Sequence, residues 1–90
     1  MLSAEEQKAF REAERKLQKL RKGAGAKIAK LEASIAEAEE AIEALEEEMV
    51  SAGADVGKLT ELGEARDARQ AKVDAWYAEW EELEELLADE

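Results

Sequence analysis

The feature that most constrains this chain's fold is a seam of apolar residues spaced alternately three and four positions apart. The seam comprises Ile28, Leu31, Ile35, Ala38, Ile42, Leu45 and Met49. Glutamate, alanine and lysine fill most positions between them, which predicts a helix with one narrow apolar stripe, as in a coiled coil. Such a stripe is buried only when another helix packs along it.

A second seam with similar spacing follows a glycine-containing stretch, residues 51–57, in which we expect a loop. Its members are Leu59, Leu62, Val73, Trp76, Trp80, Leu83 and Leu87, with Arg66 and Arg69 in the gap. A short loop makes consecutive helices antiparallel neighbours. Residues 27–50 and 58–88 therefore predict an all-α fold, an antiparallel two-helix coiled-coil hairpin.

The register of this hairpin determines which side chains meet across the seam. It places Ile35 opposite Val73, and it puts Trp76 and Trp80 opposite apolar residues of the first helix. We therefore expect both indoles in the core. Tyr77 lies off the seam and is expected to expose its ring.

Arg66 and Arg69 interrupt the apolar pattern of the second seam. Their aliphatic stems can cross the seam while their guanidinium groups reach carboxylates of the first helix. The register offers Glu39 or Glu43 as partners, so we interpret both arginines as structural.

The beginning of the chain extends beyond the end of the second helix in this register. Ser3 and Glu6 have the spacing of a capping box, which predicts a helix start. The apolar stripe continues into this segment without a partner in the hairpin. The segment either folds back or docks on another chain or domain, through an interface comprising Phe10, Ala13 and Leu17.

Two glycines, Gly23 and Gly25, interrupt the first helical pattern. A phosphate-binding Walker loop needs a preceding strand and a hydroxyl after its lysine, and neither is present here. Glycine costs roughly 1 kcal/mol in a helix interior, and these two coincide with a stutter in the heptad spacing. Residues 23–26 therefore predict a hinge or kink between a basic helical segment, residues 1–22, and the hairpin.

Charge is distributed unevenly along the chain. Residues 1–30 hold nine Lys/Arg and four Glu, a net charge of +5, whereas residues 31–90 hold four Lys/Arg and twenty Asp/Glu, a net charge of −16. Five cations recur at helical spacing and form the overhang stripe, defined as Lys8, Arg11, Arg15, Lys19 and Lys22. It is about 21 Å long at the rise of an α-helix. Flanking cations are Lys16, Arg21, Lys27 and Lys30. Such a stripe can follow a nucleic-acid backbone by charge alone, or it can be an ordinary solvated face.

Other functions lack the residues that they need. The chain has no histidine and no cysteine, so neither a thiol nucleophile nor a zinc site is expected. Its many glutamates lack a pocket that would perturb their pKa values for acid–base chemistry. We predict no enzyme activity, no metal and no cofactor for this chain. No apolar run is long enough to span a bilayer, and the absence of cysteine fits a cytoplasmic location.

The pattern from about residue 14 to residue 87 resembles the C-terminal coiled-coil domain of ABC-F proteins, soluble ATP-binding-cassette ATPases. The resemblance rests on "KIAKLEASIAEAEEAIEALEEEM", "KLTEL" and "YAEWEELEELL". It implies an antiparallel helical hairpin that follows two ATPase cassettes of the same parent chain, which would carry the ATP-binding motifs. It also implies a contact with the ribosome in translation, or with ribosomal RNA or DNA. The acidic hairpin departs from the family and confines such a contact to the basic end.

Three functional hypotheses follow. The first is an accessory domain of an ABC-F-type ATPase that touches RNA or DNA through its basic residues. The second is a purely structural coiled coil that self-associates or docks on another protein. The third is an acidic protein-binding surface on the second helix.

Overall fold

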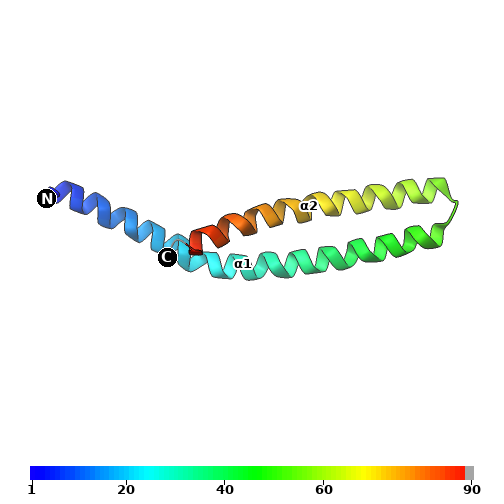
Figure 1. The fold of residues 1–90 in the computed structure, drawn as a ribbon, viewed down its shortest axis with the longest axis horizontal. Helices are drawn as coiled ribbons and strands as arrows, with labels where there is room; N and C mark the ends of the chain where they lie inside the picture. The colour runs from blue at the N-terminus through cyan, green and yellow to red at the C-terminus, as the bar shows by residue number, and fades with distance from the viewer. Residues whose placement is uncertain (89–90) are drawn as a thin grey trace.

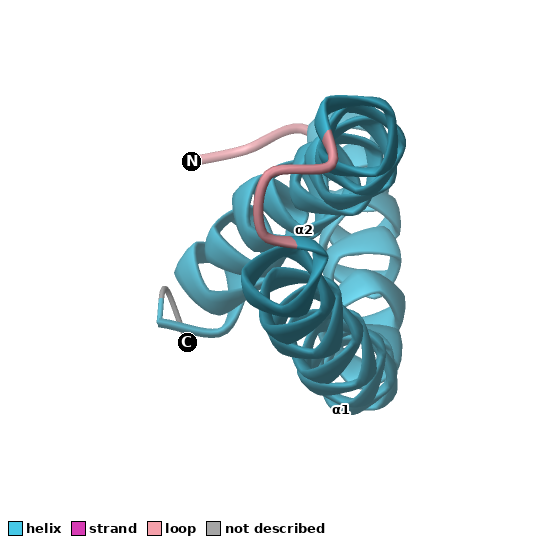
Figure 2. Ribbon diagram, turned by 90° about the vertical axis from the view of Figure 1, so that its right-hand side faces the viewer, coloured by secondary structure: helices cyan, strands magenta, loops and turns pink. Residues whose placement is uncertain are grey.

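The computed structural model describes residues 1–88 and contains two long helices. They are α1 (Ala4–Ala52) and α2 (Val56–Ala88). They lie antiparallel and form a hairpin, and the whole molecule measures 74 × 18 × 14 Å (Figure 1). Viewed along the long axis, the helices are inclined to one another rather than stacked as straight rods (Figure 2). The predicted all-α hairpin is confirmed.

Local capping explains where α1 begins. The Ser3 hydroxyl accepts a hydrogen bond from the backbone N–H of Glu6 at 3.2 Å, and the Ser3 carbonyl accepts one from Gln7. The Glu6 carboxylate meets the Ser3 hydroxyl at 3.2 Å. Ser3 is thus the predicted N-cap. A complete capping box requires the Glu6 carboxylate to accept from the backbone N–H of Ser3, but here the carboxylate contacts the Ser3 hydroxyl instead.

The turn between the helices is shorter than the predicted loop at residues 51–57. Gly53 ends α1 with φ +59° and ψ −116°, a conformation that glycine adopts readily and other residues do not, and its N–H donates to the Val50 carbonyl. Asp55 precedes α2, and its side chain accepts from the N–H of Lys58 at 3.1 Å. These two caps let the helices run to Ala52 and from Val56.

The helix α1 passes through Gly23 and Gly25 without a break. Its axis changes direction in this part of the chain, where the ribbon turns from blue to cyan (Figure 1). A kink rather than an open hinge therefore joins the basic segment to the hairpin. Ala24, between the two glycines, is completely buried, and its packing helps to hold this turn helical.

The core is one layer of apolar side chains along the seam. Ile35, Ala38, Ile42 and Val73 form a buried cluster, with Trp76 packed against it. This cluster confirms the predicted register. The expectation that both tryptophans would be core is wrong in degree, because Trp76 and Trp80 are only half-buried. Two helices alone cannot enclose an indole.

Beyond the C-terminal end of α2, the first part of α1 projects as a single helix (Figure 1). We call this segment, up to residue 20, the overhang; the overhang stripe lies along it and continues to Lys22 at the start of the paired region. Phe10 is 58% exposed and Leu20 is 57% exposed. The apolar stripe thus continues beyond the helix that covers it in the hairpin.

Candidate functional site

The two sides of the seam differ in chemistry. On one side, Glu32, Glu39 and Glu46 recur at intervals of seven residues along α1, so they lie on the same helix face. Each accepts one hydrogen bond from α2. The donors are Nε1 of Trp80 to Glu32 at 3.0 Å, the hydroxyl of Tyr77 to Glu39 at 2.9 Å, and Nε of Arg66 to Glu46 at 3.3 Å. We call these three contacts the glutamate ladder.

The ladder corrects one predicted contact. Arg66 pairs with Glu46 and with its neighbour Asp67, not with Glu39 or Glu43. Glu39 is occupied by Tyr77 instead. The Arg66–Glu46 pair is exposed, so its contribution to stability is about 0–1 kcal/mol. The structural interpretation of Arg66 holds, with a different partner.

The ladder also perturbs the one tyrosine of the chain. The hydrogen bond to Glu39 raises the pKa of Tyr77 above its ordinary value of 10.0, and desolvation and the negative charge of Glu39 act in the same direction. All three effects favour the neutral phenol beside a carboxylate. Tyr77 therefore stays protonated and acts as a donor at neutral pH.

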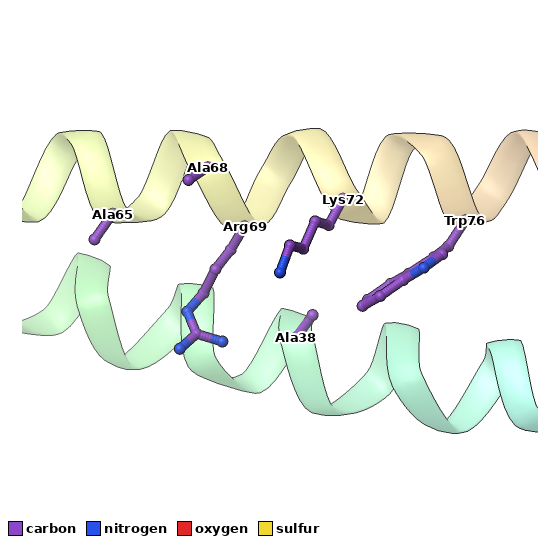
Figure 3. A pocket seen from close by; sticks show the side chains of 6 residues that line it. All are labelled: Ala38, Ala65, Ala68, Arg69, Lys72 and Trp76. Carbon is purple, nitrogen blue, oxygen red and sulfur yellow. The ribbon is translucent and has the colours of Figure 1, made fainter.

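The opposite side of the seam gathers cations around an aromatic ring. Arg69, Lys72 and Trp76 project from α2 toward α1, beside Ala38 (Figure 3). Lys27 and Lys30 of α1 line an adjoining hollow that also contacts Trp76. We call this set the hairpin cluster: Lys27, Lys30, Arg69 and Lys72 around Trp76.

Within residues 1–88, none of the four cations in the hairpin cluster forms an ion pair. Small side chains keep the surface beside them hollow, with Ala65 and Ala68 next to Arg69 and Lys72. Glu79 also lines the hollow beside Lys27, so the cluster is not free of acidic residues. The cluster still stands apart from the surrounding hairpin, in which acidic residues predominate.

The overhang stripe lies on the solvent-exposed surface of α1. Lys8, Arg11 and Arg15 line one shallow hollow together with Glu12. Lys16, Lys19 and Lys27 line another, beside Leu20 and Gly23. Because Lys27 belongs to both this hollow and the hairpin cluster, the two cationic regions adjoin.

Arg21 differs from the other cations predicted in this region. It is half-buried, and its Nε donates to the backbone carbonyl of Leu86 at 3.4 Å. This contact joins α1 to the last turns of α2. The other eight predicted cations, Lys8, Arg11, Arg15, Lys16, Lys19, Lys22, Lys27 and Lys30, are all exposed.

Sequence reasoning missed the contribution of α2 to this surface. It interpreted Arg69 only as a residue of the seam and did not consider Lys72. The signal was present, because the register that pairs Ile35 with Val73 also places Lys72 beside the seam near Ala38.

The described residues provide neither a metal site nor a membrane-spanning helix. Within residues 1–88, no group of acidic side chains is placed to hold a metal ion. In the same part of the chain, no helix has the length and apolar character of a membrane span.

Comparison with known proteins gives one result. The family model described as "ABC transporter C-terminal domain" matches residues 19–85. The match covers most of the hairpin, including the glutamate ladder and the hairpin cluster, and begins within the overhang stripe. No curated protein and no solved structure matched the chain.

Proposed function

The chain belongs to the ABC transporter C-terminal domain family, and from that premise we propose that it is a non-catalytic accessory domain of an ABC-F-type ATPase. In this proposal the domain follows the ATPase domains of its parent chain in the cytoplasm. Its overhang stripe contacts ribosomal RNA or DNA. The flanking cations Lys16, Lys27 and Lys30 extend the contact toward the hairpin.

The observation that carries this proposal is the exposure of a cationic helix face on an otherwise acidic chain. All five residues of the overhang stripe are exposed, and an α-helix places side chains at this spacing on one face. Exposed lysines and arginines release counterions when they neutralise phosphates, and this release drives binding that does not depend on sequence. The acidic residues that predominate on the hairpin repel the same phosphates, which favours the overhang stripe as the main contact.

A salt series tests the proposal. We expect the chain to bind a structured RNA or a duplex DNA with a log–log salt slope of several units, consistent with up to about five phosphate contacts. Changing Lys8, Arg11, Arg15, Lys19 and Lys22 together to Gln should abolish the binding and the slope. Lys58→Gln, at the far end of the hairpin, is the matched control and should bind as the unaltered chain does. Absence of binding to both ligands at low salt would refute the proposal.

Self-association is a second candidate, favoured by the exposed apolar stripe of the overhang. Phe10 is 58% exposed, and within residues 1–88 no second helix covers it. A second copy that packed on Phe10, Ala13 and Leu17 would bury this stripe. Sedimentation should then show a dimer that dissociates in the Phe10→Ser variant, whereas a monomer at all concentrations would exclude this candidate.

A further inference from the structure

We propose that the hairpin cluster is a second contact for nucleic acid, which binds a single strand by stacking one base against Trp76. The proposal rests on the proposed function, because it assumes that the chain meets nucleic acid. It adds a contact on the hairpin to the one on the overhang. It also adds stacking of a base to the charge contacts with phosphates.

The first argument is the position of Trp76 between two hollows. One hollow encloses about 290 Å³ and is bounded by Arg69, Lys72 and small alanines. The other encloses about 250 Å³ and is bounded by Lys27, Lys30 and Glu79. The half-buried indole lines both, while part of it packs on the core. It is thus a fixed ring whose remaining surface borders open space on two sides.

The second argument is charge. Lys27, Lys30, Arg69 and Lys72 contribute four positive charges around one ring, on a chain whose net charge is −11. Within the described residues none of them is paired with a carboxylate. By contrast, the glutamate ladder on the other side of the seam uses its carboxylates to bind α2. The hairpin thus keeps its cations unpaired on the side where the ring borders a hollow.

The third argument is the kind of ligand that this combination fits. A cationic surface with an accessible aromatic ring is the arrangement by which proteins bind single strands, since any base can stack on the ring while phosphates contact the cations. In a duplex both faces of each base are already stacked on neighbours. An acidic peptide would satisfy the cations, but only a nucleic acid supplies a flat base beside every phosphate. The ring therefore favours a single strand.

Fluorescence gives a direct test, because the chain has two tryptophans. In the Trp80→Phe variant the remaining indole is Trp76, and we expect oligodeoxythymidine of about 16 nucleotides to quench it. In the Trp76→Phe variant the remaining indole is Trp80, which donates to Glu32 on the other side of the seam, and we expect little quenching. An abasic oligonucleotide of equal length presents the phosphates without bases and should quench neither variant.

Affinity measurements separate stacking from charge. Trp76→Leu should weaken binding of the oligodeoxythymidine roughly 5- to 150-fold, the range for loss of one stacked base. Trp80→Leu is the matched control and should change this affinity little. Arg69→Gln with Lys72→Gln should lower the salt slope for the single strand, whereas Lys58→Gln should not. Circular dichroism of each variant verifies that the hairpin is intact.

The outcomes distinguish this inference from the function on which it rests. If duplex binds through the overhang stripe but Trp76 is not quenched and Trp76→Leu has no effect, this inference fails and the proposed function stands. If oligodeoxythymidine quenches Trp76 but the fivefold Gln variant binds duplex as well as the unaltered chain does, the proposed contact through the overhang stripe is refuted instead. Equal binding of the abasic strand, or displacement by polyglutamate with the same quenching, would show a general anion surface and overturn base stacking.

Discussion

Tyr77 is the residue whose titration the structure most clearly alters. Its protonated hydroxyl donates to Glu39 at 2.9 Å, and its pKa is raised above the ordinary 10.0. A raised pKa in the folded state means that the stabilisation is complete below the unfolded value and is lost as pH rises through the folded value. We therefore expect tyrosinate absorbance to appear at higher pH in the folded chain than in the urea-unfolded chain.

Two variants test the cause of this shift. Glu39→Gln removes the charge and should bring the pKa of Tyr77 back toward its ordinary value. Tyr77→Phe should remove this contribution to the loss of stability at alkaline pH. Identical tyrosinate curves for the unaltered chain and Glu39→Gln would contradict the Glu39 carboxylate as the cause.

The glycines of α1 provide a prediction at the level of the element. Gly23 and Gly25 lie within the helix, and a Cβ added at either would meet nothing within 4 Å. Alanine is favoured over glycine in a helix by about 1 kcal/mol. Each Gly→Ala substitution should therefore raise the free energy of unfolding by roughly 0.5–1 kcal/mol, as measured by urea denaturation.

The same substitution at Gly53 should have the opposite sign. Its φ of +59° is a conformation that alanine adopts only with strain, at a cost of roughly 1 kcal/mol or more. Gly53→Ala is thus the matched contrast for Gly23→Ala and Gly25→Ala. Destabilisation by the two helical substitutions would indicate that the kink itself depends on glycine.

Much of the helical architecture is predictable from the sequence. The apolar seams and the short loop between them determine the pairing of Ile35 with Val73, which lie in one buried cluster. The exact helix ends are not predictable from the sequence, because Gly53 and Asp55 cap the helices closer to the turn than the residue pattern indicates. The continuity of α1 through Gly23 depends on tertiary packing of its neighbours, which local helix propensity does not include.

The candidate site is less predictable than the fold. Spacing alone places the overhang stripe on one helix face. It does not show that Arg21 donates to the Leu86 carbonyl or that Lys72 joins Lys27 across the seam, because these depend on side-chain reach between two helices. Likewise, the sevenfold spacing of Glu32, Glu39 and Glu46 is visible in the sequence, but their donors are not.

Charge over the whole molecule predicts how salt affects its stability. Residues 31–90 carry a net charge of −16, so most of the hairpin repels itself, while the interhelical Arg66–Glu46 pair is exposed and contributes about 0–1 kcal/mol. Raising sodium chloride from about 0.01 to about 1 M shortens the Debye length from roughly 30 to 3 Å. Screening should therefore stabilise the fold more than it weakens this pair.

Thermal melting followed by circular dichroism measures this effect. If screening contributes about 1 kcal/mol, the Tm should rise by roughly 4–8 °C across the series. A Glu46→Gln variant removes the ion pair and should show at least as large a rise. A Tm that falls with salt would mean that attractive pairs outweigh the repulsion.

The single-layer seam also determines how the hairpin comes apart. Residues that meet near Gly53 are close in sequence, whereas Arg21 and Leu86 are 65 positions apart, so loop closure costs most entropy at the open end. The hairpin should therefore form its contacts first near the turn and lose them first at its open end. The overhang is attached at that open end. A force applied to the overhang would peel the seam apart one contact at a time, starting with Arg21 and Leu86, instead of breaking the whole fold at once.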